Sequence, residues 1–77
     1  MNKKYLVVTG GAGFVGTNLI KILLKKTNLN IISIDNYSTG KFKNHIDNKK
    51  VKYIKGDTKN ISKILQNYKS YINSIFH

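Results

Sequence analysis

The feature that most constrains this chain is a glycine-rich segment at residues 9–16, Thr-Gly-Gly-Ala-Gly-Phe-Val-Gly, between two apolar stretches. Residues 5–9 are apolar and rich in β-forming side chains, as in a short strand that is buried on both faces. Residues 14–26 carry apolar side chains at helical spacing and end in two lysines, which favour the carboxyl end of a helix. The sequence therefore predicts a strand, a glycine loop and a helix in immediate succession.

The rest of the chain repeats this alternation. Strands are predicted at residues 31–35 and 51–55, and a fourth apolar run begins at Ser74. Residues 41–50 are polar and rich in lysine, so we expect a solvated loop there. The order of these elements predicts an α/β fold: the first half of a Rossmann-type doubly wound parallel sheet (β-α-β-loop-β-α-β) with right-handed crossovers.

Two apolar patterns define the predicted helices. The buried face of the first is expected to consist of Val15, Leu19, Ile22 and Leu23. The second predicted helix has apolar residues at i, i+3, i+4, i+7 and i+11, namely Ile61, Ile64, Leu65, Tyr68 and Ile72. Asp57 or Thr58 is expected to cap this second helix at its start.

Composition excludes several classes of protein. The formal charge is +11, but all 14 basic residues are lysine. Specific nucleic-acid recognition relies heavily on arginine, so we expect no nucleic-acid partner. Lysine, asparagine and isoleucine, which have the most A/T-rich codons, are abundant together, so we attribute the charge to codon bias. The chain has no cysteine, which excludes disulfides and thiolate metal sites, and we expect no metal. No apolar run is long enough to span a membrane, and the glycines arrive too early for a signal peptide, so a cytoplasmic protein without a membrane partner is expected.

The glycine loop predicts a dinucleotide site. It matches G-x-G-x-x-G through Gly11, Gly13 and Gly16, and G-x-x-G-x-x-G if Gly10 is counted first. In this fingerprint the first glycine allows a tight turn, the second lets the backbone approach a pyrophosphate, and the third lets the helix pack closely on the strand. A P-loop is excluded because Thr17 stands where a phosphate-binding lysine is required.

Two of the three acidic residues end predicted strands. Asp35 follows Gly16 by 19 residues, close to the spacing of about 20 at which a carboxylate binds the adenosine ribose. That carboxylate would repel a 2′-phosphate, which favours NAD over NADP. Asp57 ends the third strand, where it can cap the next helix, contact adenine, or do both. Asp47, in the lysine-rich loop, is expected to be a surface residue.

Together these pieces resemble the N-terminal part of an extended short-chain dehydrogenase/reductase of the NAD-dependent epimerase/dehydratase family, similar to its UDP-glucose 4-epimerase-like members. The resemblance rests on four segments: residues 9–16, Asp-Asn-Tyr-Ser-Thr-Gly-Lys at 35–41 with Asn44 following, Gly56-Asp57, and Ile75-Phe76-His77. It spans essentially all 77 residues but only about the first quarter of such an enzyme. Residues 1–77 are therefore expected to be the N-terminal part of an NAD-binding domain, without the rest of that domain or the substrate domain.

The resemblance also implies a set of cofactor contacts. The amides of Phe14 and Val15 would meet the pyrophosphate, residues 35–40 would line the ribose, and Asp57-Thr58 would reach the adenine. Thr58 stands where the family usually has isoleucine or leucine. The NAD-binding residues implied are Gly10, Gly13, Phe14, Val15, Gly16, Asp35, Asn36, Tyr37, Ser38, Thr39, Gly40, Asp57 and Thr58.

The activity implied is epimerisation of a UDP-sugar or another nucleotide sugar, by removal and return of a hydride at C4. The catalytic Ser or Thr and the Tyr-x-x-x-Lys pair are expected downstream of His77, so residues 1–77 alone should be inactive. Tyr37 and Lys41 match that spacing literally, but they lie in a glycine-containing turn rather than on a helix. The alternatives are a related dehydratase, decarboxylase or reductase, or a non-catalytic dinucleotide-binding module. A homodimer of the full-length protein is one option left open.

Overall fold

The computed structural model describes residues 4–37 and 42–76. The helices and strands, in chain order, are β1 (Tyr5–Thr9), α1 (Phe14–Lys26), β2 (Asn30–Asp35), β3 (Val51–Lys55), α2 (Ile61–Ile64) and β4 (Ile72–Phe76). Short 3₁₀ turns occur at Phe42–Asn44, Thr58–Asn60 and Gln66–Tyr71. The predicted strands therefore form, with bounds that differ by at most two residues at their starts.

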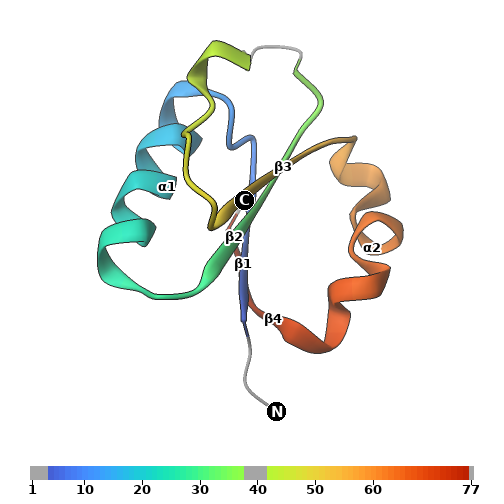
Figure 1. The fold of residues 1–77 in the computed structure, drawn as a ribbon. Coiled ribbons are helices and arrows are strands. Elements are labelled where there is room, and N and C mark those ends of the chain that lie inside the picture. Colours follow the sequence, from blue (N-terminus) through green and yellow to red (C-terminus); the bar gives the residue numbers. More distant parts are fainter. Residues whose placement is uncertain (1–3, 38–41, 77) are drawn as a thin grey trace.

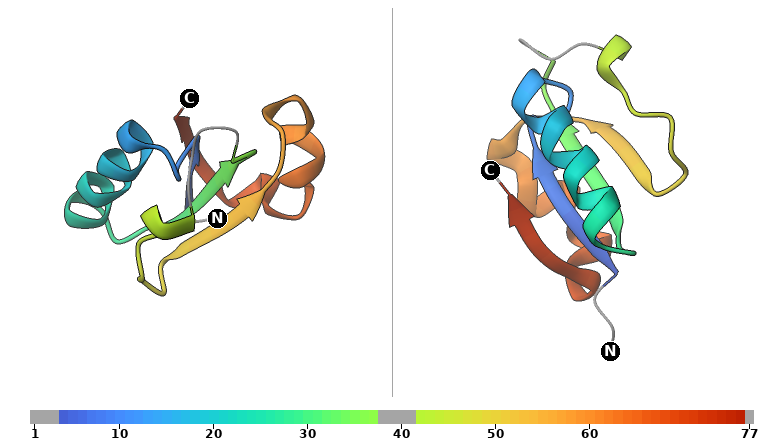
Figure 2. Two further views of the ribbon diagram at one scale, coloured as in Figure 1. Left: turned by 90° about the horizontal axis from the view of Figure 1, so that it is seen from above. Right: turned by 90° about the vertical axis from the view of Figure 1, so that its left-hand side faces the viewer.

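The four strands form one parallel sheet in the order β3-β2-β1-β4. Helix α1 covers one face of this sheet, and α2 with its flanking 3₁₀ turns covers the other (Figures 1 and 2). The chain passes from the β3 edge to the β4 edge through α2. The expected α/β architecture, a Rossmann-like parallel sheet with helices on both faces, is confirmed.

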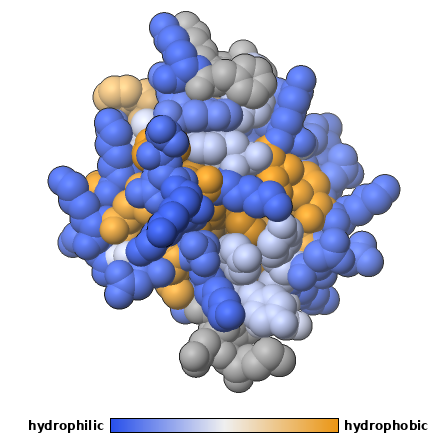
Figure 3. All heavy atoms as spheres, in the orientation of Figure 1, coloured by the Kyte–Doolittle hydropathy of each residue, from blue (hydrophilic) through white to orange (hydrophobic). Residues whose placement is uncertain are grey.

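A layer of apolar side chains lies on each side of the sheet. The layer between α1 and the sheet consists of Leu6, Val8 and Ile31 from the strands and Ile20 from the helix. The layer between α2 and the sheet consists of Val7, Ile32 and Ile34 from the strands and Leu65 from the end of α2. Because both faces of the central strands β1 and β2 are covered, these strands are continuous apolar runs rather than alternating ones. At the periphery, polar side chains dominate the surface, with apolar ones visible between them (Figure 3).

The buried face of α1 differs from the predicted one. Gly16 and Ile20 are buried, whereas Val15 and Ile22 are 78% and 50% exposed. The helix is rotated because Gly16 packs directly against the backbone of the glycine loop, as described below. Leu19 and Leu23 pack against the core as predicted, so only part of the predicted face, Val15 and Ile22, is wrong.

The second predicted helix is also shorter than expected. Only Ile61–Ile64 is α-helical, and residues 66–71 continue as a 3₁₀ helix. Ile72, which was expected to end the helix, instead opens β4 and pairs with Tyr5. A 3₁₀ helix rises about 2 Å per residue against 1.5 Å in an α-helix, so it carries the chain back to the sheet in fewer residues. Within residues 4–37 and 42–76, no helix has the length and apolarity needed to cross a membrane.

Candidate functional site

The carboxyl ends of β1, β2 and β3 meet around a cleft of about 220 Å³. Two backbone hydrogen bonds join these ends: Gly10 N–H donates to the Ile34 carbonyl, and Gly56 N–H donates to the Asp35 carbonyl. The residues lining the cleft are Thr9, Gly10, Gly13, Ile34, Asp35, Asn36, Gly56 and Thr58. This edge is where open parallel α/β sheets bind ligands.

The glycines of the loop serve different purposes. Gly10 has a φ of +70°, a conformation that favours glycine. A Cβ atom on Gly16 would collide with the Gly10 carbonyl oxygen and the Gly11 Cα, and one on Gly11 would collide with the Ser33 hydroxyl. A Cβ on Gly13 would meet only the Gly10 carbonyl oxygen, at 3.4 Å, and Gly13 has an ordinary φ of −83°. The conformation and packing of the loop therefore require glycine at Gly10, Gly11 and Gly16, but not at Gly13.

The N-terminus of α1 lies next to this loop and has backbone N–H groups that no acceptor in the described residues occupies. Its N-cap is Gly13, which has no side chain, and its first turn carries no acidic residue. Thr17 N–H donates to the Gly13 carbonyl at 2.9 Å, whereas the N–H groups of Phe14 and Val15 have no acceptor among the described residues. These amides stand at the positive end of the helix dipole. The arrangement suits an anionic group such as a phosphate.

Asp35 is the one buried acidic side chain in the described part of the chain, at 7% exposure. Its Oδ2 accepts a hydrogen bond from Ala12 N–H at 3.0 Å, and its Oδ1 accepts one from Tyr37 N–H at 2.8 Å. Each carboxylate oxygen can accept a second hydrogen bond, so the group is oriented by the backbone and still able to receive ligand hydroxyls. The sequence predicts Asp35 as a ligand contact, but it gives no sign of the hydrogen bond that Asp35 accepts from Ala12 in the glycine loop.

Aromatic side chains pack next to Asp35. The Tyr37 hydroxyl lies 2.6 Å from Nε2 of His45, whose ring stacks on Tyr53 with the centroids 3.7 Å apart. The Tyr53 hydroxyl accepts a hydrogen bond from Ile46 N–H at 2.8 Å. Burial raises the pKa of Tyr37, and the charge of Asp35 adds to the shift. Residues 44–46 are therefore packed against the protein, unlike the solvated loop expected for residues 41–50, because these contacts compensate their desolvation.

At the end of β3, Asp57 and Thr58 have separate roles. The Asp57 carboxylate accepts a hydrogen bond from Lys59 N–H at 2.9 Å and caps the 3₁₀ turn at residues 58–60. The predicted cap therefore forms on this turn, whereas the N-cap of α2 itself is Asn60, which makes no side-chain cap hydrogen bond. Thr58 lines the cleft, whereas Asp57 does not.

The predicted site residues fall into four groups. Those that line the cleft are Gly10, Gly13, Asp35, Asn36 and Thr58. Those at the adjoining start of α1 are Phe14, Val15 and Gly16. Tyr37 and Asp57 lie next to lining residues, and Ser38, Thr39 and Gly40 lie outside the described residues. Thr9, Ile34 and Gly56 line the cleft without having been predicted, although each directly precedes a predicted residue or an acidic strand end.

The sequence is similar to a protein-family model and to a curated enzyme. The model of the 3-beta hydroxysteroid dehydrogenase/isomerase family matches residues 7–77. A curated relative, the ADP-L-glycero-D-manno-heptose-6-epimerase of Thiobacillus denitrificans, is 49% identical over 45 residues, which are 57% of this chain and 14% of the relative.

Solved structures share the fold. The dTDP-glucose 4,6-dehydratase of Bacillus anthracis, in complex with NAD, matches 94% of this chain and 25% of its own, with 27% identity and a TM-score of 0.79. The UDP-glucose 4-epimerase of Thermotoga maritima, with UDP-glucose, matches 91% of this chain and 23% of its own, with 27% identity and a TM-score of 0.69. The present chain thus spans a quarter or less of the length of these relatives. Their names confirm the resemblance to NAD-dependent epimerases and dehydratases.

Proposed function

The chain belongs to the 3-beta hydroxysteroid dehydrogenase/isomerase family, and on that premise we propose that residues 1–77 are the N-terminal NAD-binding part of a nucleotide-sugar epimerase. One observation carries the proposal: an uncapped helix N-terminus and a buried carboxylate, Asp35, meet at one cleft. The first suits a pyrophosphate and the second a ribose diol, and few ligands other than a dinucleotide present both.

We assign residues of this chain to three parts of NAD: the pyrophosphate, the adenosine ribose and the adenine. The free amides of Phe14 and Val15 would hold the pyrophosphate, which would approach the backbone over Gly13, where a side chain would intrude. Asp35 would accept the adenosine ribose hydroxyls, with Asn36 and Tyr37 beside it. Thr58, with Asp57 before it, would contact the adenine.

The reaction we propose is epimerisation at C4 of a UDP-sugar or a related nucleotide sugar. NAD, when bound, would take up the hydride from the sugar and return it. The Thermotoga maritima enzyme supports a 4-epimerase, whereas the Bacillus anthracis enzyme favours a dehydratase as the second candidate. The cytoplasmic location and the oligomeric state stay predictions.

The Asp35 carboxylate is expected to set both affinity and cofactor choice. In the full-length protein, Asp35→Asn should raise the Kd of NAD about tenfold, because the amide cannot accept two ribose hydrogen bonds while it holds the loop. It should also reduce the preference for NAD over NADP, since the repulsion of a 2′-phosphate is lost. Isothermal calorimetry with both cofactors measures this. Asp47→Asn, which removes an exposed charge, is the matched control. Unchanged affinity and unchanged selectivity would contradict the proposed ribose contact.

Residues 1–77 alone should show no turnover. A base and its partner must share one helix face beside the nicotinamide, and Tyr37 instead lies in a loop at the opposite, adenosine end of the proposed site. The purified chain, supplied with NAD and UDP-glucose or UDP-galactose, should yield no epimerised or oxidised sugar. Turnover that survives Tyr37→Phe would show that another group in this chain is catalytic.

A further inference from the structure

The backbone of Ala12 is held from both sides by side chains distant in sequence. Ala12 is fully buried in the middle of the glycine loop. Its N–H donates to Asp35 Oδ2 at 3.0 Å, and its carbonyl accepts a hydrogen bond from Asn44 Nδ2 at 2.9 Å. These partners lie 23 and 32 positions away along the chain. The proposed cofactor contacts account for Asp35 but leave Asn44 unexplained.

The bond from Asn44 fixes the peptide plane that directly precedes the start of α1. The Ala12 carbonyl and the Gly13 N–H belong to the same peptide group, and that N–H donates to the Gly10 carbonyl at 3.1 Å. The next peptide group, which contains the Phe14 N–H, is held through its Gly13 carbonyl, which accepts the Thr17 N–H at 2.9 Å. Holding the Ala12–Gly13 group therefore fixes where the start of α1, with the amides of Phe14 and Val15, lies relative to Gly10. Their aim determines how well they meet a pyrophosphate.

The segment that carries Asn44 is itself anchored. His45 stacks on Tyr53 and contacts the Tyr37 hydroxyl, and Ile46 packs against the apolar layer beneath α1. Asn44 is therefore a rigid support for the loop rather than a side chain on a free surface.

We propose that Asn44 is a positioning residue for the dinucleotide, which holds the glycine loop in its pyrophosphate-binding shape through the Ala12 carbonyl. This inference rests on the proposed function and extends it to a residue outside the cleft. It separates the two side chains that hold Ala12: Asn44 would act on the pyrophosphate alone, whereas Asp35 would act on the ribose as well as on the loop.

The test compares ligands with and without the pyrophosphate in the full-length protein. Asn44→Ala should raise the Kd of NAD and of ADP-ribose about tenfold, the effect of one well-aligned hydrogen bond, and leave the Kd of AMP within about twofold. Asn48→Ala is the matched control, because Asn48 lies in the same loop and its side chain accepts only the Lys50 N–H among the described residues; its other hydrogen bonds, to Ile46 and Val51, are made by its backbone and survive the change. Equal losses for all three ligands, or no loss, would overturn the inference.

A second variant covers the case in which Asn44→Ala fails to fold. Asn44→Asp keeps the size of the side chain but replaces the donor with an oxygen that repels the Ala12 carbonyl, and it should show the same selective loss. If neither variant folds, Asn44 serves the fold and the inference is wrong. If Asp35→Asn leaves NAD binding unchanged, the proposed function fails instead, whatever Asn44 does.

Discussion

Alanine at Gly13 is expected to weaken NAD binding about 100-fold in the full-length protein while leaving its melting temperature nearly unchanged, the loss expected if two charge-assisted hydrogen bonds are displaced. The added methyl group would meet only the Gly10 carbonyl oxygen, at an ordinary contact distance of 3.4 Å, so the fold tolerates it. It would, however, occupy the face of the loop that lines the cleft. Calorimetry with NAD and thermal unfolding measure the two effects separately.

The matched variant is Gly16→Ala, where the same methyl group meets backbone atoms of Gly10 and Gly11. Neither neighbour can move without shifting the loop or the helix, so this change should cost about 1–3 kcal/mol of stability and lower the melting temperature. The pair thus separates a glycine needed by the ligand from one needed by the fold. Unchanged NAD affinity in Gly13→Ala would show that the pyrophosphate lies elsewhere.

Strands β1 and β2 could be predicted from the sequence because burial on both faces leaves a largely apolar run bounded by polar or glycine residues. The edge strand β3 could be predicted because its side chains alternate in polarity. The orientation of α1 could not. Two stripes on this helix are apolar, one through Val15 and Ile22 and the other through Ile20 and Leu24, and both share Leu19 and Leu23 between them. The contact of Gly16 with the loop decides between them, and hydrophobic periodicity carries no information on such a backbone contact.

The candidate site was predictable to the extent that it depends on strand ends. Gly10, Asp35 and Thr58 follow or end three parallel strands, and the carboxyl ends of such strands lie along one edge of the sheet. The two hydrogen bonds of the Ala12 backbone, in which its N–H donates to Asp35 and its carbonyl accepts from Asn44, were not predictable, since they depend on how the loops fold back in three dimensions. No spacing rule connects residues 12 and 44.

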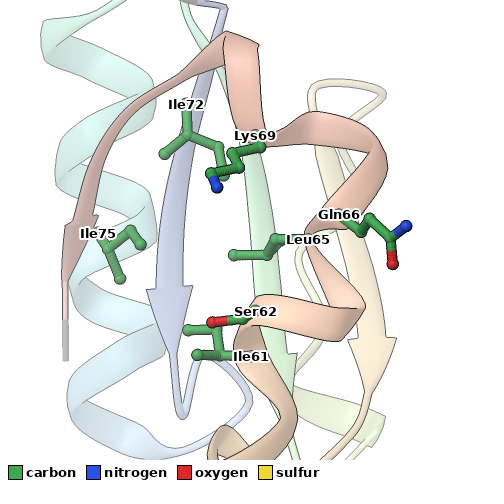
Figure 4. A pocket seen from close by; sticks show the side chains of 7 residues that line it. All are labelled: Ile61, Ser62, Leu65, Gln66, Lys69, Ile72 and Ile75. Carbon is green, nitrogen blue, oxygen red and sulfur yellow. The ribbon is translucent and has the colours of Figure 1, made fainter.

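The isolated chain of residues 1–77 is expected to be loosely folded or to associate, and to bind NAD only weakly. A groove of about 310 Å³ runs between α2 with its following turn and β4, and its lining is mostly apolar. Figure 4 shows isoleucine and leucine side chains pointing into it, whereas Gln66 points away. Ile75 on β4 remains 42% exposed, and both β3 and β4 are open sheet edges. Uncovered apolar surface and strand edges favour association in a chain whose stability is small.

The net charge of +11 opposes this association, so the prediction includes a dependence on salt. Raising the ionic strength from about 0.01 M to 1 M shortens the screening length from about 30 Å to about 3 Å and should promote self-association. Analytical ultracentrifugation measures the size of the species formed, and hydrogen exchange measures how strongly the backbone amides of the sheet are protected. Ile75→Lys should suppress association, whereas Ile22→Lys, at a position on α1 that is 50% exposed, should not. A monomer with strong amide protection across residues 5–9, 31–35 and 51–55 and a sharp thermal transition would show instead that this segment folds as an independent domain.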